Sequence, residues 1–423
     1  MSIDPREIAI EAVAGVPGVP SAKGRSLGYD AWLRLRRNRM AMMSLGTLIT
    51  IAVLAVLTPL LPLAAPDKHH TDLQYESPKL KPFFVDSFSL DWKAIDETPA
   101  KLDEVYKELA ADKQHYDEIR RAESDPESQA LKKAENEVNR MENEVNSVLY
   151  KAYREAGFAD IGPVSRWMVR MRVRIFGGWT LGSIAGRDEF GRDVLARVFW
   201  GARISIIVGI VATLVSLIIG VTYGAISGYV GGWIDDVMMR FVDILYSLPF
   251  IFIVIFLISI LSEDTLKARL AAWGIDRIMI FYLVVGAIYW LTMARVVRGQ
   301  VISLRNELFV ESARAVGASQ TRIIVKHILP NLLSVVIVYL TLTIPRVMLF
   351  EAFLSFLGLG VEPPDVSWGL LANEGIKVIT PIKIYWWLIV FPSLALGITL
   401  YALNFLGDGL RDALDPKLTA RRT

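Results

Sequence analysis

The chain alternates between long apolar runs and one long, densely charged segment. Six runs are apolar and long enough to cross a bilayer, because a helix rises about 1.5 Å per residue and roughly 20 residues cross the hydrocarbon core. They are Ala41–Pro66, Ile204–Ile234, Ile244–Leu261, Ile278–Val297, Leu332–Phe353 and Ile384–Leu406. We therefore predict an all-α polytopic membrane protein with six transmembrane helices.

The short segments that flank these runs carry unequal numbers of Lys and Arg. Arginines are dense before the first run, between the fourth and fifth runs, and after the sixth. Because basic residues favour the cytoplasmic side, both termini are expected in the cytoplasm. The charged segment 66–190 is then external.

Within that external segment, residues 98–157 show helical periodicity. Apolar residues recur at three- and four-residue spacing on both sides of Asp125-Pro126, which is typical of two heptad arrays joined by a turn. We predict an external coiled-coil helical hairpin. Its role is either a docking arm for an extracellular partner or a solvated insertion.

Two shorter features of the insertion have competing interpretations. Arginines alternate with apolar residues over Arg166–Phe176, which fits either an amphipathic element at the membrane surface or a half-buried strand. The pair His69-His70 has no third ligand nearby, so we expect a loop pair and no metal site.

Composition narrows the class further. Hydrophobic residues make up 53% of the chain and charged residues 21%, against about 45–50% and about 25% in a soluble domain. Together with the runs above, this excludes a disordered chain, a fibrous repeat and a purely soluble enzyme. The net charge of +2 implies no basic surface for nucleic acid. The absence of cysteine excludes disulfides and thiolate metal sites.

The segment between the fourth and fifth runs carries the most specific pattern. Small residues occupy positions 312, 313 and 315, and Gly317 suits a left-handed helix end. A second helical stretch, about 319–328, is expected to end at Pro330. A short exposed helix with a small-residue face predicts docking into a groove of a soluble partner. An ordinary basic connecting loop is the alternative.

This segment also resembles a known family. The pattern Glu311-x-Ala313-x3-Gly317-x9-His327-x-Leu329-Pro330 is similar to the EAA loop of binding-protein-dependent ABC importer permeases, with Ser312 in place of the usual Ala. Four further stretches match the oligopeptide, dipeptide and nickel group of these permeases in the same order. They begin at Gly191, Gly228, Glu351 and Leu406.

The resemblance implies a type I ABC importer permease fold and a multi-pass protein of the bacterial inner membrane. It implies a cytoplasmic tail over 1–39, a first transmembrane helix over 40–65, the insertion over 66–190, a permease core over 191–417 with a coupling loop at 298–331, and a tail over 418–423. The residues implied in ATPase coupling are Glu311, Ser312, Ala313, Gly317, His327, Leu329 and Pro330.

The implied partners are a second permease, two ATPase subunits and an extracytoplasmic substrate-binding protein. The chain contains no Gly-x4-Gly-Lys-Ser/Thr sequence, so we expect no cofactor and no enzymatic activity in it. ATP and Mg are expected on the ATPase subunits. The cargo implied is an oligopeptide or dipeptide, and nickel or another small solute is the alternative.

Three charged residues lie in or near the predicted spans, where an ionisable group is costly and therefore a functional candidate. For Asp243, Arg346 and Glu351 we expect a role in the transport path or between subunits. The structural alternatives are that Asp243 pairs with Arg240 at the interface, that Glu351 caps structure near the outer end of its span, and that Arg346 pairs with Glu351 or with another chain.

Two other classes of protein are less consistent with the sequence. A stand-alone secondary transporter would show inverted repeats or several intramembrane carboxylates, and the sequence shows no internal repeat. A membrane-anchored structural protein would leave the five ordered stretches unexplained.

Overall fold

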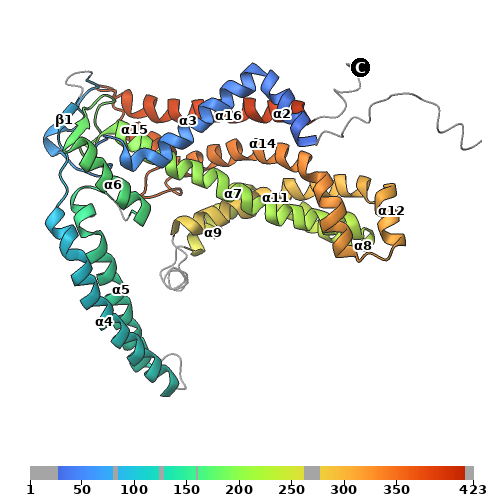
Figure 1. Cartoon of the computed structure of the whole chain (residues 1–423), viewed down its shortest axis with the longest axis horizontal. Helices are drawn as coiled ribbons and strands as arrows, with labels where there is room; N and C mark the ends of the chain where they lie inside the picture. The colour runs from blue at the N-terminus through green and yellow to red at the C-terminus, as the bar shows by residue number, and fades with distance from the viewer. Residues whose placement is uncertain (1–26, 80–83, 123–127, 159–160, 262–276, 415–423) are drawn as a thin grey trace, which may run out of the picture.

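The computed structural model describes residues 27–79, 84–122, 128–158, 161–261 and 277–414. Five helices in these ranges are long and apolar enough to cross a membrane, and a sixth span is present if one bent helix pair is counted. They lie side by side in Figure 1. The five are α3 (Arg39–Leu57, continued by the turn η1, Thr58–Leu60), α7 (Val194–Val230), α11 (Arg277–Leu304), α14 (Leu329–Phe356) and α16 (Trp387–Leu414).

The predicted third span is the element that differs from the sequence-based expectation. The continuous helix expected over Ile244–Leu261 is wrong, because α8 (Gly232–Ser247) and α9 (Phe250–Leu261) are separate and meet at 91°. Leu248 between them has extended backbone angles, φ −81° and ψ 136°. A residue before proline is disfavoured in helical conformation, and Pro249 follows Leu248.

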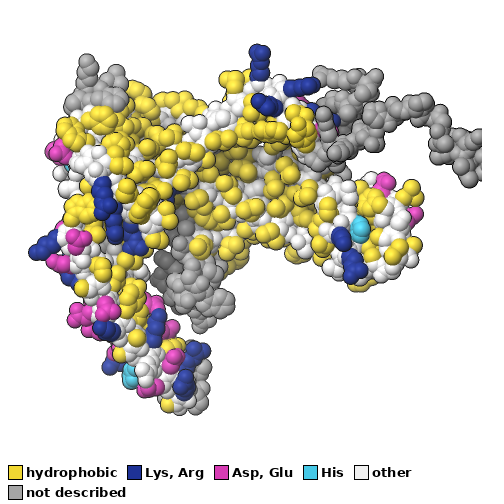
Figure 2. Space-filling view, viewed as in Figure 1, with side chains coloured by type: hydrophobic (Ala, Val, Ile, Leu, Met, Phe, Trp, Pro, Cys, Tyr) yellow, Lys and Arg dark blue, Asp and Glu magenta, His cyan; other side chains and the backbone are white. Residues whose placement is uncertain are grey.

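The surface of the molecule has an apolar band with charged side chains gathered around it. Figure 2 shows hydrophobic side chains covering the face of the helix bundle, whereas Asp and Glu gather mainly on α4, α5 and the end near α12, and Lys and Arg gather there and also near α2 and α6. Such a band is what a helix bundle exposes to acyl chains, since every span needs an apolar outer face.

α7 and α11 approach each other so closely at three glycines of α7 that a side chain would not fit there. At Gly224, an added Cβ would lie 2.4 Å from the carbonyl oxygen of Ala294, and at Gly220 and Gly228 it would lie 2.6 Å and 2.7 Å from atoms of α11. These glycines are spaced by four residues and so share one face of α7. Small residues at such spacing let two membrane helices approach to backbone contact.

The helix α15 (Trp368–Lys377) closes one end of the bundle over α7. Ser367 caps it by accepting a hydrogen bond from the Leu370 amide at 3.1 Å. Trp368 donates from its backbone amide to Ser205 at 3.1 Å and from its indole nitrogen to the Val198 carbonyl at 2.9 Å. Because both hydrogen bonds go to α7, they fix the position of α15 and its rotation about its own axis. At the opposite end, α2 (Leu27–Arg37) packs with α3 against α16.

The insertion contains a long helical hairpin. α4 (Trp92–Ala122) and α5 (Gln129–Glu155) pack along a buried seam, and Lys113 of α4 forms an ion pair with Glu142 of α5 at 2.8 Å. The seam is made of Val105, Leu109, Met141 and Val145, with Leu102, Val138 and Val148 partly buried around it. The predicted pair of helices is confirmed, and α4 begins earlier than expected. Asp125-Pro126 lies outside the described residues, and the coiled-coil character and the external location stay predictions.

The base of the insertion is a small sheet with one helix. β1 (Phe84–Asp86) pairs antiparallel with β2 (Trp179–Leu181), and the short turn η2 (Thr71–Leu73) precedes them. The stretch Arg166–Phe176, which fitted either an amphipathic element or a half-buried strand, is part of the helix α6 (Pro163–Phe176). Its Arg172 is buried, with the guanidinium 4.0 Å from the centroid of the Phe88 ring, and this burial lowers the pKa of Arg172 to about 10.

The contact between α7 and α11 can be tested with two glycines that differ only in their surroundings. We expect Gly224→Ala to lower the free energy of unfolding by about 1–3 kcal/mol, because the new methyl group overpacks the contact. Gly299 of α11 has no atom within 4 Å of an added Cβ. Gly299→Ala should therefore be neutral or stabilising by about 0.5–1 kcal/mol through helix propensity. Thermal unfolding of both variants in the same detergent makes the comparison, and equal midpoints would contradict the close contact.

Candidate functional site

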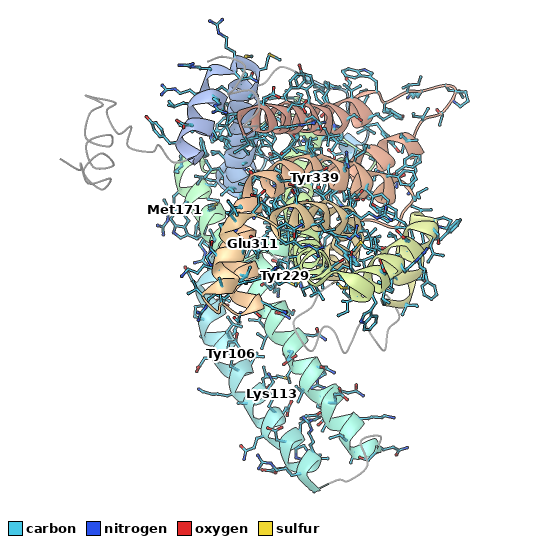
Figure 3. All side chains as sticks on the ribbon, turned by 90° about the vertical axis from the view of Figure 1, so that its right-hand side faces the viewer. Tyr106, Lys113, Met171, Tyr229, Glu311 and Tyr339 are labelled. Atoms are coloured by element: carbon cyan, nitrogen blue, oxygen red, sulfur yellow. The ribbon has the colours of Figure 1, made fainter. Side chains whose placement is uncertain are left out.

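The segment between α11 and α14 forms a short exposed helix, and one of its side chains is fully buried in the bundle. α12 (Leu308–Ala315) places Glu311 in its first turn, where the helix dipole favours an anion. Val310 is fully buried in a cluster with Val301, Ile323 and Ile328. Glu311 and Ser312 are exposed, whereas Ala313 packs partly against the same cluster. Figure 3 shows Glu311 at the end of the molecule that faces the viewer.

Gly317 makes the turn that follows α12. Its φ of +83° lies in the left-handed region, which confirms the predicted turn, and an added Cβ would meet no atom within 4 Å. A side chain at this position is therefore limited by backbone strain rather than by space. The Ala318 amide donates to the Ala313 carbonyl at 3.0 Å and closes the turn.

The chain then re-enters the bundle without the break that was expected. α13 (Gln320–Ile323) continues through a π-helical turn, η3 (Ile324–Ile328), directly into α14. The prediction that this stretch ends at Pro330 is wrong. Pro330 sits in the first turn of α14, where a missing amide is tolerated, and the wider π turn precedes it.

The remaining predicted residues of the loop lie along this re-entry. His327 and Leu329 are half-buried and Pro330 is exposed. The His327 carbonyl accepts a hydrogen bond from the Asn331 side chain at 2.7 Å. Leu329 packs on the cluster that holds Val310. These three residues therefore belong to the segment that re-enters the bundle behind α12, whereas Glu311 and Ser312 belong to the outer surface of α12.

The outer surface of the loop exposes apolar side chains. Val316 is 89% exposed, Leu308 78% and Val325 58%. Leu308 and Val316 neighbour the exposed Ser312 and Ala315, whose small size leaves room for close approach. Apolar groups next to small residues at the polar end of a membrane bundle are typical of a protein contact. The small residues between 312 and 315 predicted this surface from the sequence. Nothing in the sequence around Leu308 predicted that its side chain would be exposed.

Several contacts join the loop to the end of α7. The Arg314 guanidinium donates to the Tyr229 hydroxyl at 3.4 Å, and Arg305 donates to the Gly228 carbonyl at 3.2 Å. Nearby, Arg298 of α11 binds Asp235 of α8 with two hydrogen bonds of 2.6 Å. Sequence reasoning missed this pair, because the residues lie 63 positions apart and only the match beginning at Gly228 marked the region.

Two of the predicted intramembrane charges have structural partners. Asp243 accepts a hydrogen bond from Arg295 at 2.7 Å, so the alternative that paired Asp243 with Arg240 is wrong. Glu351 is fully buried and accepts a hydrogen bond from the Ser355 hydroxyl at 2.8 Å. The alternative that paired Glu351 with Arg346 is also wrong. Glu351 instead lies inside α14 and binds Ser355, one turn further along the same helix.

Arg346 is different, because its side chain is exposed on the outside of the bundle. It lies ten residues before the end of α14, or about 15 Å along the helix. A hollow of about 680 Å³ lies beside it, lined by Tyr289 of α11 and by a row of side chains from α14. The row includes the aromatic rings of Phe350, Phe353 and Phe356. The hollow therefore combines aromatic walls with one cation at membrane depth.

A buried ion network lies at the opposite end of the bundle, where α7 begins. Asp188 binds Arg192 at 2.7 Å and Arg197 at 2.8 Å, and Arg197 also binds Glu374 of α15. Asp193 caps α7 by accepting from the Ala196 amide at 2.9 Å. The match beginning at Gly191 contains part of this network. Glu374 lies 177 positions from Arg197 and could not be assigned from the sequence.

No group of three or more His, Cys, Asp or Glu side chains that could hold a metal ion occurs among the described residues. His69 instead stacks on Phe190, with ring centroids 5.2 Å apart.

Comparison with known proteins gives two family matches along the chain. Residues 220–420 match the binding-protein-dependent transport system inner membrane component. Residues 26–82 match the N-terminal transmembrane domain of oligopeptide transport permease C. The first match contains α12, the turn at Gly317 and the support beneath them, together with the hollow beside Arg346.

Curated relatives match over more than half of the chain. The oligopeptide transport system permease protein OppC of Escherichia coli K12 is 48% identical over 236 residues, which is 56% of this chain and 73% of that protein. The dipeptide transport system permease protein DppC of Bacillus subtilis is 45% identical over 55% of this chain and 68% of that protein. The glutathione transport system permease protein GsiD of Shigella flexneri is 43% identical over 55% and 72%.

Proposed function

Because the chain belongs to the family of binding-protein-dependent transport system inner membrane components, we propose that it is a permease subunit of an ATP-driven importer of oligopeptides or dipeptides. The observation that carries the proposal is the family match over residues 220–420, which contains both the exposed loop and the hollow at membrane depth. The relatives named for oligopeptide, dipeptide and glutathione transport favour a peptide cargo over nickel.

The loop of α12 is proposed as the contact with an ATPase subunit. It exposes Leu308 and Val316 around small residues, and Val310 fixes it to the core. A helix held in this way moves with the bundle, so closure of the ATPase subunits would be passed to the spans as a rigid-body movement. ATP and Mg would bind to those subunits, and this chain would carry no hydrolytic activity of its own.

Arg346 is proposed to line the path for the cargo. A charge in the middle of a span that faces acyl chains costs about 2.5–3.5 kcal/mol or more, so such side chains face a polar cavity or a partner. The hollow beside it would be closed by the second permease. Its aromatic walls suit peptide side chains, and its guanidinium suits the peptide carboxylate.

The remaining partners follow from the orientation predicted by the basic residues. With both termini in the cytoplasm, α12 lies on the cytoplasmic side and the hairpin lies outside. Figure 1 shows the hairpin leaving the bundle at the end where α7 begins and projecting to the side on which α9 lies. We propose that the extracytoplasmic binding protein docks at this end. The hairpin is a docking arm in this arrangement.

Added bulk on α12 tests the ATPase contact. Ala313 packs partly on the core, so a large residue there would also disturb folding. Ala315 is exposed, and Ala315→Trp should leave the fold unchanged while weakening ATPase binding by more than about tenfold, as expected when a close interface is disrupted. Ala111→Trp, at an exposed position of α4, makes the same substitution far from the loop and is the control for ATPase binding.

Co-purification of the ATPase with each variant, together with uptake in vesicles, measures the effect. Normal binding and coupled uptake in Ala315→Trp would mean that α12 is only a connecting loop. The permease assignment would then depend on the family match alone.

Substitution of Arg346 tests the path. Arg346→Gln removes one charge-assisted hydrogen bond to the peptide carboxylate and should lower the rate of peptide uptake by about tenfold or more. Arg346→Lys should retain part of the rate, because the charge remains. Both variants should assemble with the second permease and the ATPase. Loss of assembly in Arg346→Gln would show instead that Arg346 pairs with an acidic side chain of the partner permease, and unchanged uptake would remove it from the path.

A further inference from the structure

The helix α6 has three faces of different chemistry. Ser165, Val169 and Arg172 are buried against the base of the insertion. Val164, Trp167, Met171 and Ile175 recur at intervals of three and four residues and so share another face. On that face Val164 is 64% exposed and both Trp167 and Ile175 are 59% exposed. The apolar stripe is therefore exposed at Val164, Trp167 and Ile175, and Met171 between them is half-buried.

The third face of α6 is basic. Arg166, Arg170 and Arg174 follow at intervals of four residues, so they form a row beside the apolar stripe. The row is positioned by the hairpin: Arg170 donates to the Tyr153 hydroxyl at 2.7 Å, and the Arg166 guanidinium lies 5.2 Å from the centroid of the Tyr150 ring. Positive charge is thus held along one edge of the stripe.

The position of α6 defines what can cover the stripe. α6 contacts η1, the turn that ends the span beginning at Arg39. Ser165 accepts a hydrogen bond from Arg203 near the start of α7 at 2.9 Å. α6 therefore lies at the level where one membrane-crossing helix ends and another begins. Figure 3, which looks along the spans, places Met171 at the lateral margin of the bundle rather than within its outline.

We propose that α6 is an interfacial helix that inserts its apolar stripe into the outer leaflet and binds anionic lipid headgroups along its arginine row. Three observations agree on this partner: an uncovered apolar face with Trp167, a flanking row of cations, and a location at the ends of two spans. An amphipathic helix in the membrane interface combines the same features. Tryptophan favours this depth, because its ring is apolar and its nitrogen remains hydrated.

The consequence is a second anchor for the insertion. The hairpin base packs on the buried face of α6 through Ala152, Tyr153 and Phe158. A helix held in the headgroup layer would fix the angle at which α4 and α5 leave the membrane. The inference does not depend on the identity of the cargo, since it concerns only α6 and the bilayer.

The absence of native cysteine makes a direct test possible with single labels on the full chain. A fluorophore is attached at Ile175→Cys, and the chain is reconstituted in vesicles of phosphatidylcholine with or without about one third phosphatidylglycerol. Ile218→Cys, on an exposed position of α7, reports a site in the acyl region, and Lys93→Cys, on the first turn of α4, reports a site in water.

We expect the label at 175 to be quenched by a spin-labelled lipid, as at 218, and to lose most of the iodide quenching seen at 93. Lipid quenching should be stronger in the anionic vesicles. Arg174→Glu should weaken this dependence by about fivefold or more, and Arg140→Glu, the same charge change on the exposed face of α5, should not.

Two results would overturn the proposal. A label at 175 that iodide quenches as strongly as at 93 would show that the stripe is in water. Shielding that develops only when the second permease or the binding protein is added would show that the stripe is a protein interface. If lipid quenches the label at 218 normally in the same preparation, the spans have inserted. Neither result can then be attributed to failed insertion.

Discussion

The close contact between α7 and α11 is the constraint on which the rest of the molecule depends. Glycines at 220, 224 and 228 bring the two backbones together, so neither helix can shift without the other. The Asp235–Arg298 pair then fixes α8 to the same unit, and Tyr229 and Val310 fix α12 to it. The exposed loop is consequently an extension of a rigid pair of helices, not a flexible connection.

The same helix carries this rigidity to the other end of the bundle. α7 has 37 residues, or about 55 Å, and Arg197 in its first turn binds Asp188, which precedes the helix, and Glu374 of α15. This network and the hydrogen bonds of Trp368 join α15 to α7. Breaking a buried ion pair of this kind by removing one partner typically costs about 3–5 kcal/mol. The two ends of the permease are thus connected through one element, and the hairpin base is added beside its beginning.

Periodicity and length allowed much of the fold to be predicted, because spans, hairpin seam and the turn at Gly317 depend on local pattern. The failures have physical causes. Pro249 divided a run that was apolar throughout, and Pro330 was tolerated because a π turn precedes it. Partners distant in sequence, such as Arg298 with Asp235 and Arg197 with Glu374, depend on how helices pack and carry no local signal. The residues of the loop between α11 and α14 were found from their sequence pattern. Their role in ATPase coupling depends on the proposal about the partner subunits.

The central claim is that α12 and the α7–α11 pair move as one body when the importer turns over. It can be measured with spin labels in the cysteine-free chain within the assembled transporter. One pair of labels is placed at Glu307, the exposed residue that precedes α12, and at Leu214 of α7, and a second pair is placed at Glu307 and on the second permease. On adding an ATP analogue, the account predicts an unchanged distance within the chain and a changed distance between the permeases. A shift within the chain as large as the shift between the permeases would contradict it.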